Sequence, residues 1–272
     1  MNPTTHSTSR PQPTWSHSQE SSARIALACL DLTSLNDADT EADIARICKR
    51  AQGPFGPVAA VCVWPRLASF ARTQLPAHIG VAAVANFPHG NADIGAAVQD
   101  TLQVVQAGAQ EVDVVLPFRA LMAGDAATVT ACISAVRQAC PNLLLKVILE
   151  TGELRTPALI QRASELALVA GADFLKTSTG KTPLSATPEA ARIMLNAIAT
   201  SPVARSHVGF KVSGGIRTVQ DAIVYESLAA QILGVEALNP RRFRIGASSI
   251  LSDIEAVLTG NIPASAAAPG SY

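Results

Sequence analysis

Four short apolar segments each carry one charged residue, and these four residues are the first candidates for chemistry. They are Asp113 in EVDVVLP, Lys146 in LLLKVILE, Lys176 in DFLKTS and Lys211 in VGFKVS. A charged side chain inside a buried strand is costly unless it is used or paired. Where such residues cluster, burial and neighbouring positive charge disfavour the ammonium form of a lysine and leave a nucleophilic amine. A carboxylate beside that amine can move protons for it.

Simpler interpretations exist for each of these residues taken singly. A lysine near a strand end can extend its stem to solvent, and Asp113 can serve as a structural ion-pair partner. Three lysines on neighbouring strands in register are expected in one layer of the interior, which favours catalysis. Two points stay open: whether Lys146 is a charge neighbour of the site or a structural partner of Asp113 or Glu150, and whether Lys176 or Lys211 is the nucleophile.

A second group of residues is typical of a phosphate site. Two glycines follow the seventh predicted strand, and two serines follow the eighth and open a helix, where backbone amides and the helix N-terminus attract anions. Barrel enzymes commonly bind phosphate at this position. The simpler alternatives are a turn, a helix cap and a solvated loop lysine. The predicted phosphate ligands are Thr179, Gly180, Lys181, Gly214, Gly215, Ser248 and Ser249.

These polar residues must be positioned by a repeating pattern of strands and helices. Short β-branched runs predict strands at 25–32, 58–64, 79–86, 111–116, 143–150, 173–178, 208–213 and 243–247. Ala-rich stretches of helical period predict helices at 40–52, 66–75, 91–107, 125–139, 156–170, 187–199, 218–233 and 249–258. Eight such units without a break in composition predict an α/β fold consisting of a single closed (β/α)₈ TIM barrel.

Composition narrows the class of protein. The chain has 272 residues, of which 48% are hydrophobic and only 15% charged, so a large core is expected. A net charge of zero gives no global field to attract nucleic acid or an anionic membrane. No uninterrupted run of 18 apolar residues predicts a membrane span. Five irregularly spaced cysteines without a CxxC pair indicate reduced thiols in a cytoplasmic protein.

The two ends differ in composition from the rest of the chain. Residues 1–22 are rich in Ser, Thr, Pro and His and predict a disordered N-terminal tail, with an organelle transit peptide as the alternative. Residues 23–260 form the predicted catalytic barrel. Residues 261–272 are small and rich in Pro and Gly, so we expect a mobile C-terminal tail.

Six segments together resemble the deoxyribose-phosphate aldolase family. They are LDLTSL from Leu30, NFPHG from Asn86, EVDVV from Glu111, KVILETGEL from Lys146, DFLKTSTGK from Asp173 and GFKVSGGIRT from Gly209. The resemblance covers roughly residues 24–258, and KTSTGK is its most specific element. It implies a lyase that reversibly splits 2-deoxy-D-ribose 5-phosphate into D-glyceraldehyde 3-phosphate and acetaldehyde in deoxyribonucleotide catabolism. It also implies a homo-oligomer, expected to be a dimer, with neither metal nor organic cofactor.

The resemblance assigns roles that spacing alone leaves open. It implies that Lys176 forms the Schiff base and that Asp113 and Lys211 are the proton donors and acceptors. Asp31 is expected to hold a substrate hydroxyl or pair with a lysine. The final residue, Tyr272, resembles a tyrosine that often ends this family, and we hypothesise that it folds over the barrel mouth to assist proton transfer, the alternative being an exposed, disordered tyrosine.

Two other functions are compatible with parts of the pattern. A barrel isomerase or synthase would use the same phosphate loops with Asp113 as general base and no covalent intermediate. A non-catalytic protein that binds sugar phosphates would retain the loops alone, but its catalytic set should have decayed, and the set of Asp113, Lys176 and Lys211 is intact.

Overall fold

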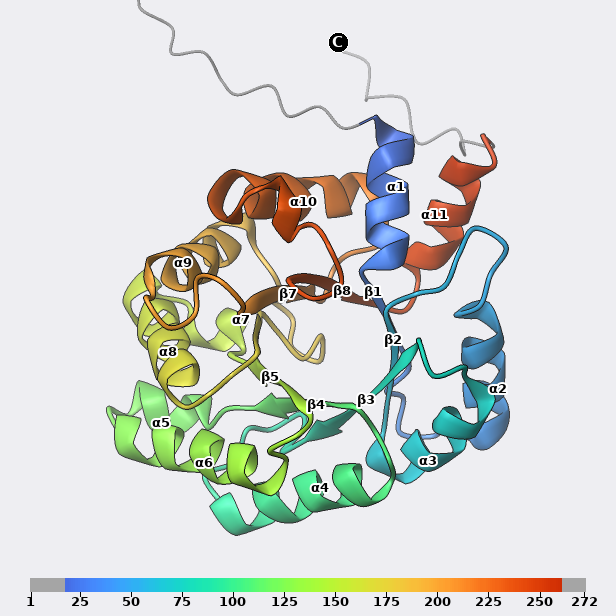
Figure 1. Cartoon of the computed structure of the whole chain (residues 1–272). Coiled ribbons are helices and arrows are strands. Elements are labelled where there is room, and N and C mark those ends of the chain that lie inside the picture. Colours follow the sequence, from blue (N-terminus) through green and yellow to red (C-terminus); the bar gives the residue numbers. More distant parts are fainter. Residues whose placement is uncertain (1–17, 261–272) are drawn as a thin grey trace, which may run out of the picture.

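The computed structural model describes residues 18–260, which form a closed barrel of eight parallel strands in chain order (Figure 1). Each strand pairs with the next, and the last pairs with the first, which confirms the predicted (β/α)₈ architecture. The strands are β1 (Leu30–Thr33), β2 (Ala60–Val63), β3 (Gly80–Ala85), β4 (Glu111–Val115), β5 (Leu144–Ile148), β6 (Phe174–Lys176), β7 (Gly209–Ser213) and β8 (Phe243–Ala247).

Helices surround the barrel and connect successive strands. Most begin at a Ser, Thr or Asp whose side chain accepts a hydrogen bond from the first turn; Thr40 and Thr218 form complete capping boxes. The helices are α2 (Glu41–Arg50), α3 (Pro65–Gln74), α4 (Ile94–Gln106), α5 (Phe118–Met122), α6 (Ala126–Ala139), α7 (Thr151–Leu154), α8 (Pro157–Val169), α9 (Pro188–Thr200), α10 (Val219–Leu233), the 3₁₀ helix η1 (Val235–Ala237) and α11 (Ile250–Leu258). The short elements α5, α7 and η1 were not predicted.

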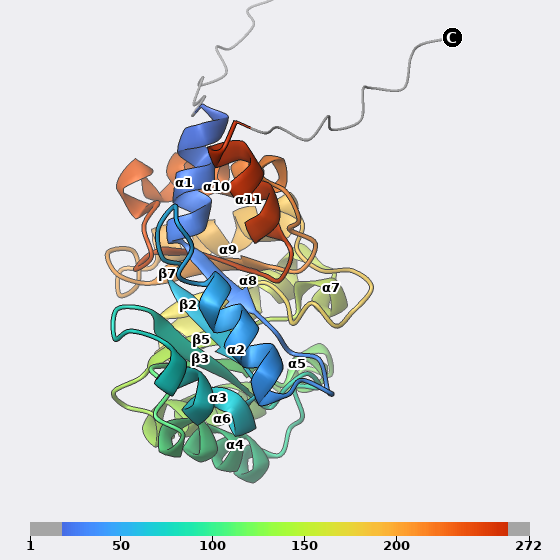
Figure 2. The ribbon, with the colours of Figure 1, turned by 90° about the vertical axis from the view of Figure 1, so that its right-hand side faces the viewer.

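The first element corrects the sequence-based prediction. Residues 25–28 belong not to a strand but to a helix, α1 (Gln19–Ala28), so the first strand begins only at Leu30. Ser18 caps α1, and the helix packs against α10 and α11 (Figure 2). The predicted tail therefore overlaps the start of α1. Residues 1–17 and 261–272, including Tyr272, lie outside the described residues.

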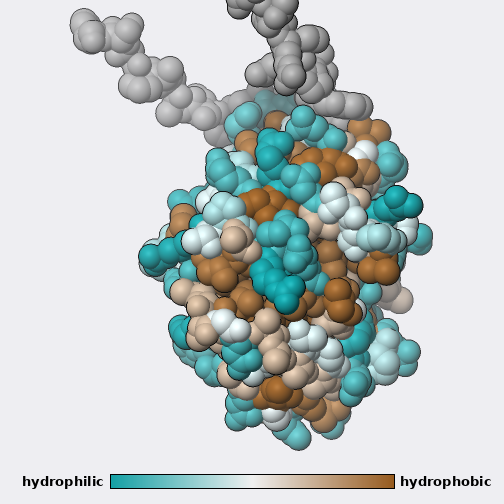
Figure 3. Space-filling view, turned by 90° about the vertical axis from the view of Figure 1, so that its left-hand side faces the viewer, coloured by the Kyte–Doolittle hydropathy of each residue, from teal (hydrophilic) through white to brown (hydrophobic). Residues whose placement is uncertain are grey.

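The core has two parts. A large apolar layer joins the outer faces of the strands to the helices, while a small apolar cluster inside the barrel consists of Leu35, Cys62, Ala82 and Val84. The interior also contains Phe174 and the buried charged residues described below. On the outer surface, polar side chains are interspersed with apolar ones (Figure 3). Within residues 18–260, no helix is long and apolar enough to cross a membrane.

Candidate active site

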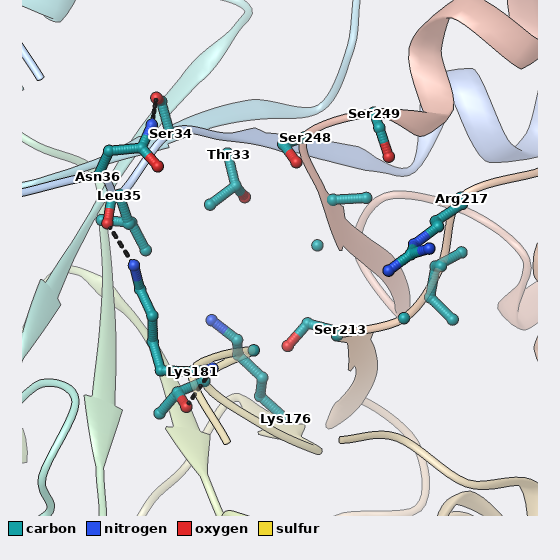
Figure 4. Close-up of a pocket in the computed structure, with 17 residues that line it drawn as sticks. Thr33, Ser34, Leu35, Asn36, Lys176, Lys181, Ser213, Arg217, Ser248 and Ser249 are labelled. Carbon is teal, nitrogen blue, oxygen red and sulfur yellow. Dashed lines mark hydrogen bonds between the residues drawn. The ribbon is translucent and has the colours of Figure 1, made fainter. Parts of the chain in front are cut away.

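The largest group of predicted site residues meets at one pocket, near the carboxyl ends of β1, β6, β7 and β8 (Figure 4). The pocket encloses about 330 Å³, and Lys176 lines it together with all seven predicted phosphate ligands. Binding at the carboxyl ends of the strands is the rule for barrel enzymes. In Figure 4 the Lys176 amine points into this space from β6.

Lys176 combines near-complete burial with access to the pocket. Its residue surface is 3% exposed, and its Nζ donates to Asp113 Oδ2 at 2.8 Å. Burial lowers the pKa of Lys176, and although the Asp113 carboxylate opposes this, the Lys211 ammonium adds to the lowering. A buried lysine with a depressed pKa is a suitable amine nucleophile.

Asp113 and Lys211 lie beside this amine, as predicted. Lys211 Nζ donates to Asp113 Oδ2 at 2.8 Å and to Asp31 Oδ2 at 2.5 Å. Burial alone would lower the pKa of Lys211, but the Asp113 and Asp31 carboxylates outweigh it and raise that pKa. Burial alone would raise the pKa of Asp113, but the lysines around it hold that pKa well below its usual value. The pair is therefore an ammonium and a carboxylate.

The structure shows which carboxylates Lys146 pairs with. Its Nζ donates to Asp113 Oδ1 at 2.8 Å and to Glu111 Oε2 at 2.5 Å on β4, and lies 3.5 Å from Asp31 Oδ2 on β1. Glu150 is not its partner; that carboxylate accepts hydrogen bonds from the backbone and hydroxyl of Thr179. The strong partners raise the pKa of Lys146 despite its burial, which fits a paired ammonium.

The expectation of a single layer of lysines is only partly correct. Lys176 and Lys211 are register partners, and Asp113 and Lys146 are register partners. Lys146, however, pairs with Phe174, two residues before Lys176, so the two pairs lie at different steps of the barrel. The stagger of a closed barrel causes this offset, and the long lysine side chains span it. None of the three reaches solvent in the way of a snorkelling lysine.

The predicted phosphate ligands line one side of the pocket with backbone and hydroxyl groups. Gly214 and Gly215 have φ values of 87° and 86°, a left-handed conformation that glycine adopts without strain. Ser249 is the N-cap residue of α11, but its side chain makes no capping hydrogen bond and is free to face the pocket. Lys181 donates from Nζ to the Leu35 carbonyl at 2.7 Å, which ties the β6–α9 loop to the β1–α2 loop across the mouth.

Sequence reasoning missed two groups of residues. Arg217, Thr33 at the end of β1 and residues 34–36 of the following loop also line the pocket, and Figure 4 shows the Arg217 guanidinium directed into it. Glu111 and Arg244 belong to the buried charge cluster, with Arg244 Nη2 donating to Glu111 Oε1 at 2.9 Å. A charge inside a predicted barrel strand was the available signal for Glu111 and Arg244.

Two further predicted residues have different outcomes. Asp31 is fully buried and pairs with Lys211 and Arg244, so it matches the lysine-pairing alternative. Burial alone would raise the pKa of Asp31, but these cations lower it below its usual value. Tyr272 is not among the described residues.

Cys62 lies inside the barrel near Lys176. It is a buried core thiol whose pKa burial raises to about 11, which makes it a poor nucleophile near neutral pH.

Two sequence comparisons identify relatives of this chain. The model of the DeoC/LacD family aldolases matches residues 25–252. A deoxyribose-phosphate aldolase of Agrobacterium fabrum (strain C58 / ATCC 33970) is 49% identical over 248 residues, covering 90% of this chain and 95% of that protein.

Two solved structures show the same fold. A crystal structure from Toxoplasma gondii ME49 has a TM-score of 0.82 at 24% identity, covering 89% of this chain and 96% of that chain, a likeness of fold alone. The deoxyribose phosphate aldolase of Aeropyrum pernix, described as a unique tetramer, has a TM-score of 0.67 at 26% identity, covering 88% and 92%. The chain belongs to the DeoC/LacD family of aldolases.

Proposed function

We propose that this aldolase reversibly cleaves 2-deoxy-D-ribose 5-phosphate to D-glyceraldehyde 3-phosphate and acetaldehyde through a Schiff base on Lys176. The observation that carries the proposal is the position of the Lys176 amine. It opens into the pocket that the predicted phosphate ligands line, and it lies 2.8 Å from a carboxylate that also binds a second lysine. The relative from Agrobacterium fabrum, with the same named activity, supports this substrate.

The chemistry follows from an amine acting as an electron sink. Lys176 Nζ attacks the C1 aldehyde of the open-chain sugar, and loss of water gives a cationic imine. Removal of the proton from the C3 hydroxyl then breaks the C2–C3 bond, and its electron pair forms an enamine. D-Glyceraldehyde 3-phosphate leaves, a proton returns to C2, and hydrolysis of the imine releases acetaldehyde and the free amine.

Asp113 and Lys211 are suited to move these protons. Asp113 accepts from both lysines through one oxygen, so a proton can pass between the two amines by way of a single carboxylate atom. Lys211 keeps a positive charge beside Lys176 and thereby favours its neutral form. In this proposal Asp113 removes the C3 hydroxyl proton, directly or through a water, and Lys211 takes part in the relay.

The predicted phosphate ligands would fix the register of the substrate. The amides around Gly214 and Gly215 and the start of α11 supply donors for a 5-phosphate. Holding the phosphate at one end of the pocket presents the aldehyde at the other end to Lys176, which reduces the entropic part of the barrier. Lys181, whose Nζ donates a hydrogen bond to the Leu35 carbonyl, also lines this pocket.

Reductive trapping tests the proposal directly. Borohydride added with 2-deoxy-D-ribose 5-phosphate should fix mass on Lys176 and abolish activity, whereas an isomerase or synthase without a covalent step would gain no mass. Lys176→Arg and Lys176→Met should lose both the label and the release of glyceraldehyde 3-phosphate in a coupled assay. Full activity in either variant would refute the proposal.

The remaining expectations concern the state of the protein. We propose a homo-oligomer, with a dimer expected; light scattering after size exclusion would measure it. A cytoplasmic location fits five unpaired, buried cysteines.

The imine serves as electron sink, so the chemistry calls for neither metal nor organic cofactor. Within residues 18–260, no group of His, Cys, Asp and Glu is arranged to hold a metal ion, and activity should persist in EDTA.

A further inference from the structure

Six buried charged side chains form a closed ring next to Lys176, with cations and carboxylates in alternation. Each member contacts the next through a hydrogen-bonded ion pair of 2.5 to 2.9 Å. Five strands contribute to it, namely β1, β4, β5, β7 and β8. In order around the ring, the members are Arg244, Asp31, Lys211, Asp113, Lys146 and Glu111.

The ring is electrically neutral without Lys176. It holds three cations and three carboxylates, and each of its six carboxylate oxygens already accepts from a ring cation. Lys176 is attached from outside, through the oxygen of Asp113 that Lys211 also uses. A proton on Lys176 would therefore add an uncompensated charge to a buried cluster, which is unfavourable at low local dielectric.

Other titratable groups lie near Lys176 but outside the ring, and the substitutions considered below leave them unchanged. On β2 the Cys62 thiol is uncharged near neutral pH, because burial raises its pKa. Beyond β5, Glu150 accepts hydrogen bonds from the Thr179 backbone and hydroxyl; burial raises its pKa, while these bonds and the charge of Lys176 oppose the rise. Lys181 and Arg217 line the outer pocket and add positive charge only. The interior positions of β3 are apolar.

Arg244 completes the ring from a place that substrate does not reach. Its guanidinium bridges Asp31 and Glu111, its Nε donates to the Pro240 carbonyl at 2.5 Å, and it lies 5.7 Å from the centre of the Phe174 ring. It is 5% exposed and does not line the pocket. A guanidinium does not lose its proton in a protein, so Arg244 supplies a permanent positive charge.

We propose that Arg244 is a positioning residue whose fixed charge makes the ring neutral and so keeps the Lys176 amine unprotonated. Arg244 shares the Asp31 carboxylate with Lys211 and the Glu111 carboxylate with Lys146, and so is connected to both lysines by ion pairs. The inference rests on the proposed role of Lys176 as nucleophile. It assigns part of the effect that keeps this amine uncharged to Arg244, a residue that does not take part in the reaction.

The charge count predicts opposite effects for two substitutions. Arg244→Met leaves three carboxylates with two cations, so a protonated Lys176 restores neutrality and holds its proton to higher pH. Glu111→Gln leaves two carboxylates with three cations, so Lys176 loses its proton at lower pH. The acidic limb of the kcat/KM profile should move about one pH unit to the alkaline side in the first variant and to the acid side in the second.

Two measurements on the full chain test this. The pH dependence of kcat/KM and of cyanoborohydride trapping of acetaldehyde on Lys176 are compared among the parent, Arg244→Met and Glu111→Gln. Arg244→Lys retains the charge but not the planar fork, so kcat falls while the limb stays in place. The double variant Arg244→Met/Glu111→Gln has a balanced ring again, and its limb should return close to that of the parent.

A merely structural role would lower activity in both single variants without moving their limbs in opposite directions. Limbs that move the same way, or not at all, would overturn the proposal. If Arg244→Met fails to fold by circular dichroism, Glu111→Gln and Arg244→Lys decide: the limb must move to acid pH in the first and stay in the second. A parent that is not labelled on Lys176 would instead refute the proposed function, so the two failures are distinguishable.

Discussion

Lys176 and Lys211 are register partners on β6 and β7, and their amines donate to the same oxygen of Asp113, each at 2.8 Å. Two ammonium groups this close to each other repel, so the state in which only one of the two amines is protonated is favoured. Asp31 decides where that proton resides, because it binds Lys211 at 2.5 Å. The pKa of Lys211 is accordingly raised and that of Lys176 lowered, against the same background of burial.

Removing the Lys211 charge should therefore change the protonation of Lys176. In Lys211→Met we expect kcat/KM at neutral pH to fall by about 10²–10⁴-fold, since a relay group is lost. Part of the loss should be recovered as the pH is raised, because Lys176 then holds its proton to higher pH. The exposed Lys49→Met on α2 is the matched control. An activity profile that falls without moving along the pH axis would contradict a charge effect.

Arg217 should act on the phosphate and not on the carbon chemistry. Its guanidinium is directed into the pocket (Figure 4), and a hydrogen bond to a charged group is worth about 1.5–3 kcal/mol. Arg217→Gln should raise KM for 2-deoxy-D-ribose 5-phosphate about 10- to 100-fold. The measurement compares this substrate with unphosphorylated 2-deoxy-D-ribose, whose kcat/KM should be little changed. Equal losses for both substrates would place Arg217 outside the phosphate site.

The β6–α9 loop depends on a glycine of another segment. A Cβ atom at Gly152 in α7 would overlap the carbonyl of Leu184, which belongs to the loop that carries Thr179 and Lys181. Gly152→Ala should displace this loop and reduce kcat/KM for the phosphorylated substrate by about 10²-fold, mainly through KM. Gly95→Ala on α4, where the new Cβ meets only the Asp93 side chain, is the matched control. Unchanged KM in Gly152→Ala would show that the loop adapts.

The barrel could be predicted because its signals are local. Each strand was an apolar run, each long helix had a helical period, and several had a plausible cap, so all eight strands were located, with boundaries within a few residues except at the start of the first. The exception was α1, where apolar residues 25–28 read as a strand. Their helical state depends on the Ser18 cap and on packing against α10 and α11, and that packing is a tertiary contact that composition does not contain.

The three main candidate catalytic residues could be predicted from the sequence, but the hydrogen-bonded ion pairs that connect them to the rest of the buried cluster could not. Asp113, Lys176 and Lys211 stood out as charges in apolar strands, and family motifs chose among them. The ring through Glu111 and Arg244 was missed, because both residues lie near the N-terminal ends of strands, where a charge can also reach solvent. Barrel stagger brings them together, and a sequence does not specify stagger.

The last prediction concerns stability and lies far from the pocket. Glu226 of α10 is 1% exposed, and among residues 18–260 its carboxylate oxygens have no partner in good hydrogen-bond geometry, although the nearby Ser22 side chain of α1 favours the charged form. Burial raises the pKa of Glu226 from 4.5 to about 8. At low pH the carboxyl is neutral in both the folded and the unfolded chain. As the pH rises from about 4.5 to 8, only the unfolded chain releases the proton, so the free energy of unfolding falls.

Glu226→Gln removes this titration. We expect the variant to gain stability relative to the parent as the pH rises, by at most about 3–5 kcal/mol at pH 9 compared with pH 4. Urea unfolding of both proteins at these two pH values measures the difference, with the exposed Glu165→Gln on α8 as control. Because α10 packs on α1, the protection of α1 amides relative to their intrinsic exchange rate should fall as the pH rises in the parent, and fall less in Glu226→Gln. A constant stability difference across the pH range would mean that Glu226 does not retain its proton in the folded chain.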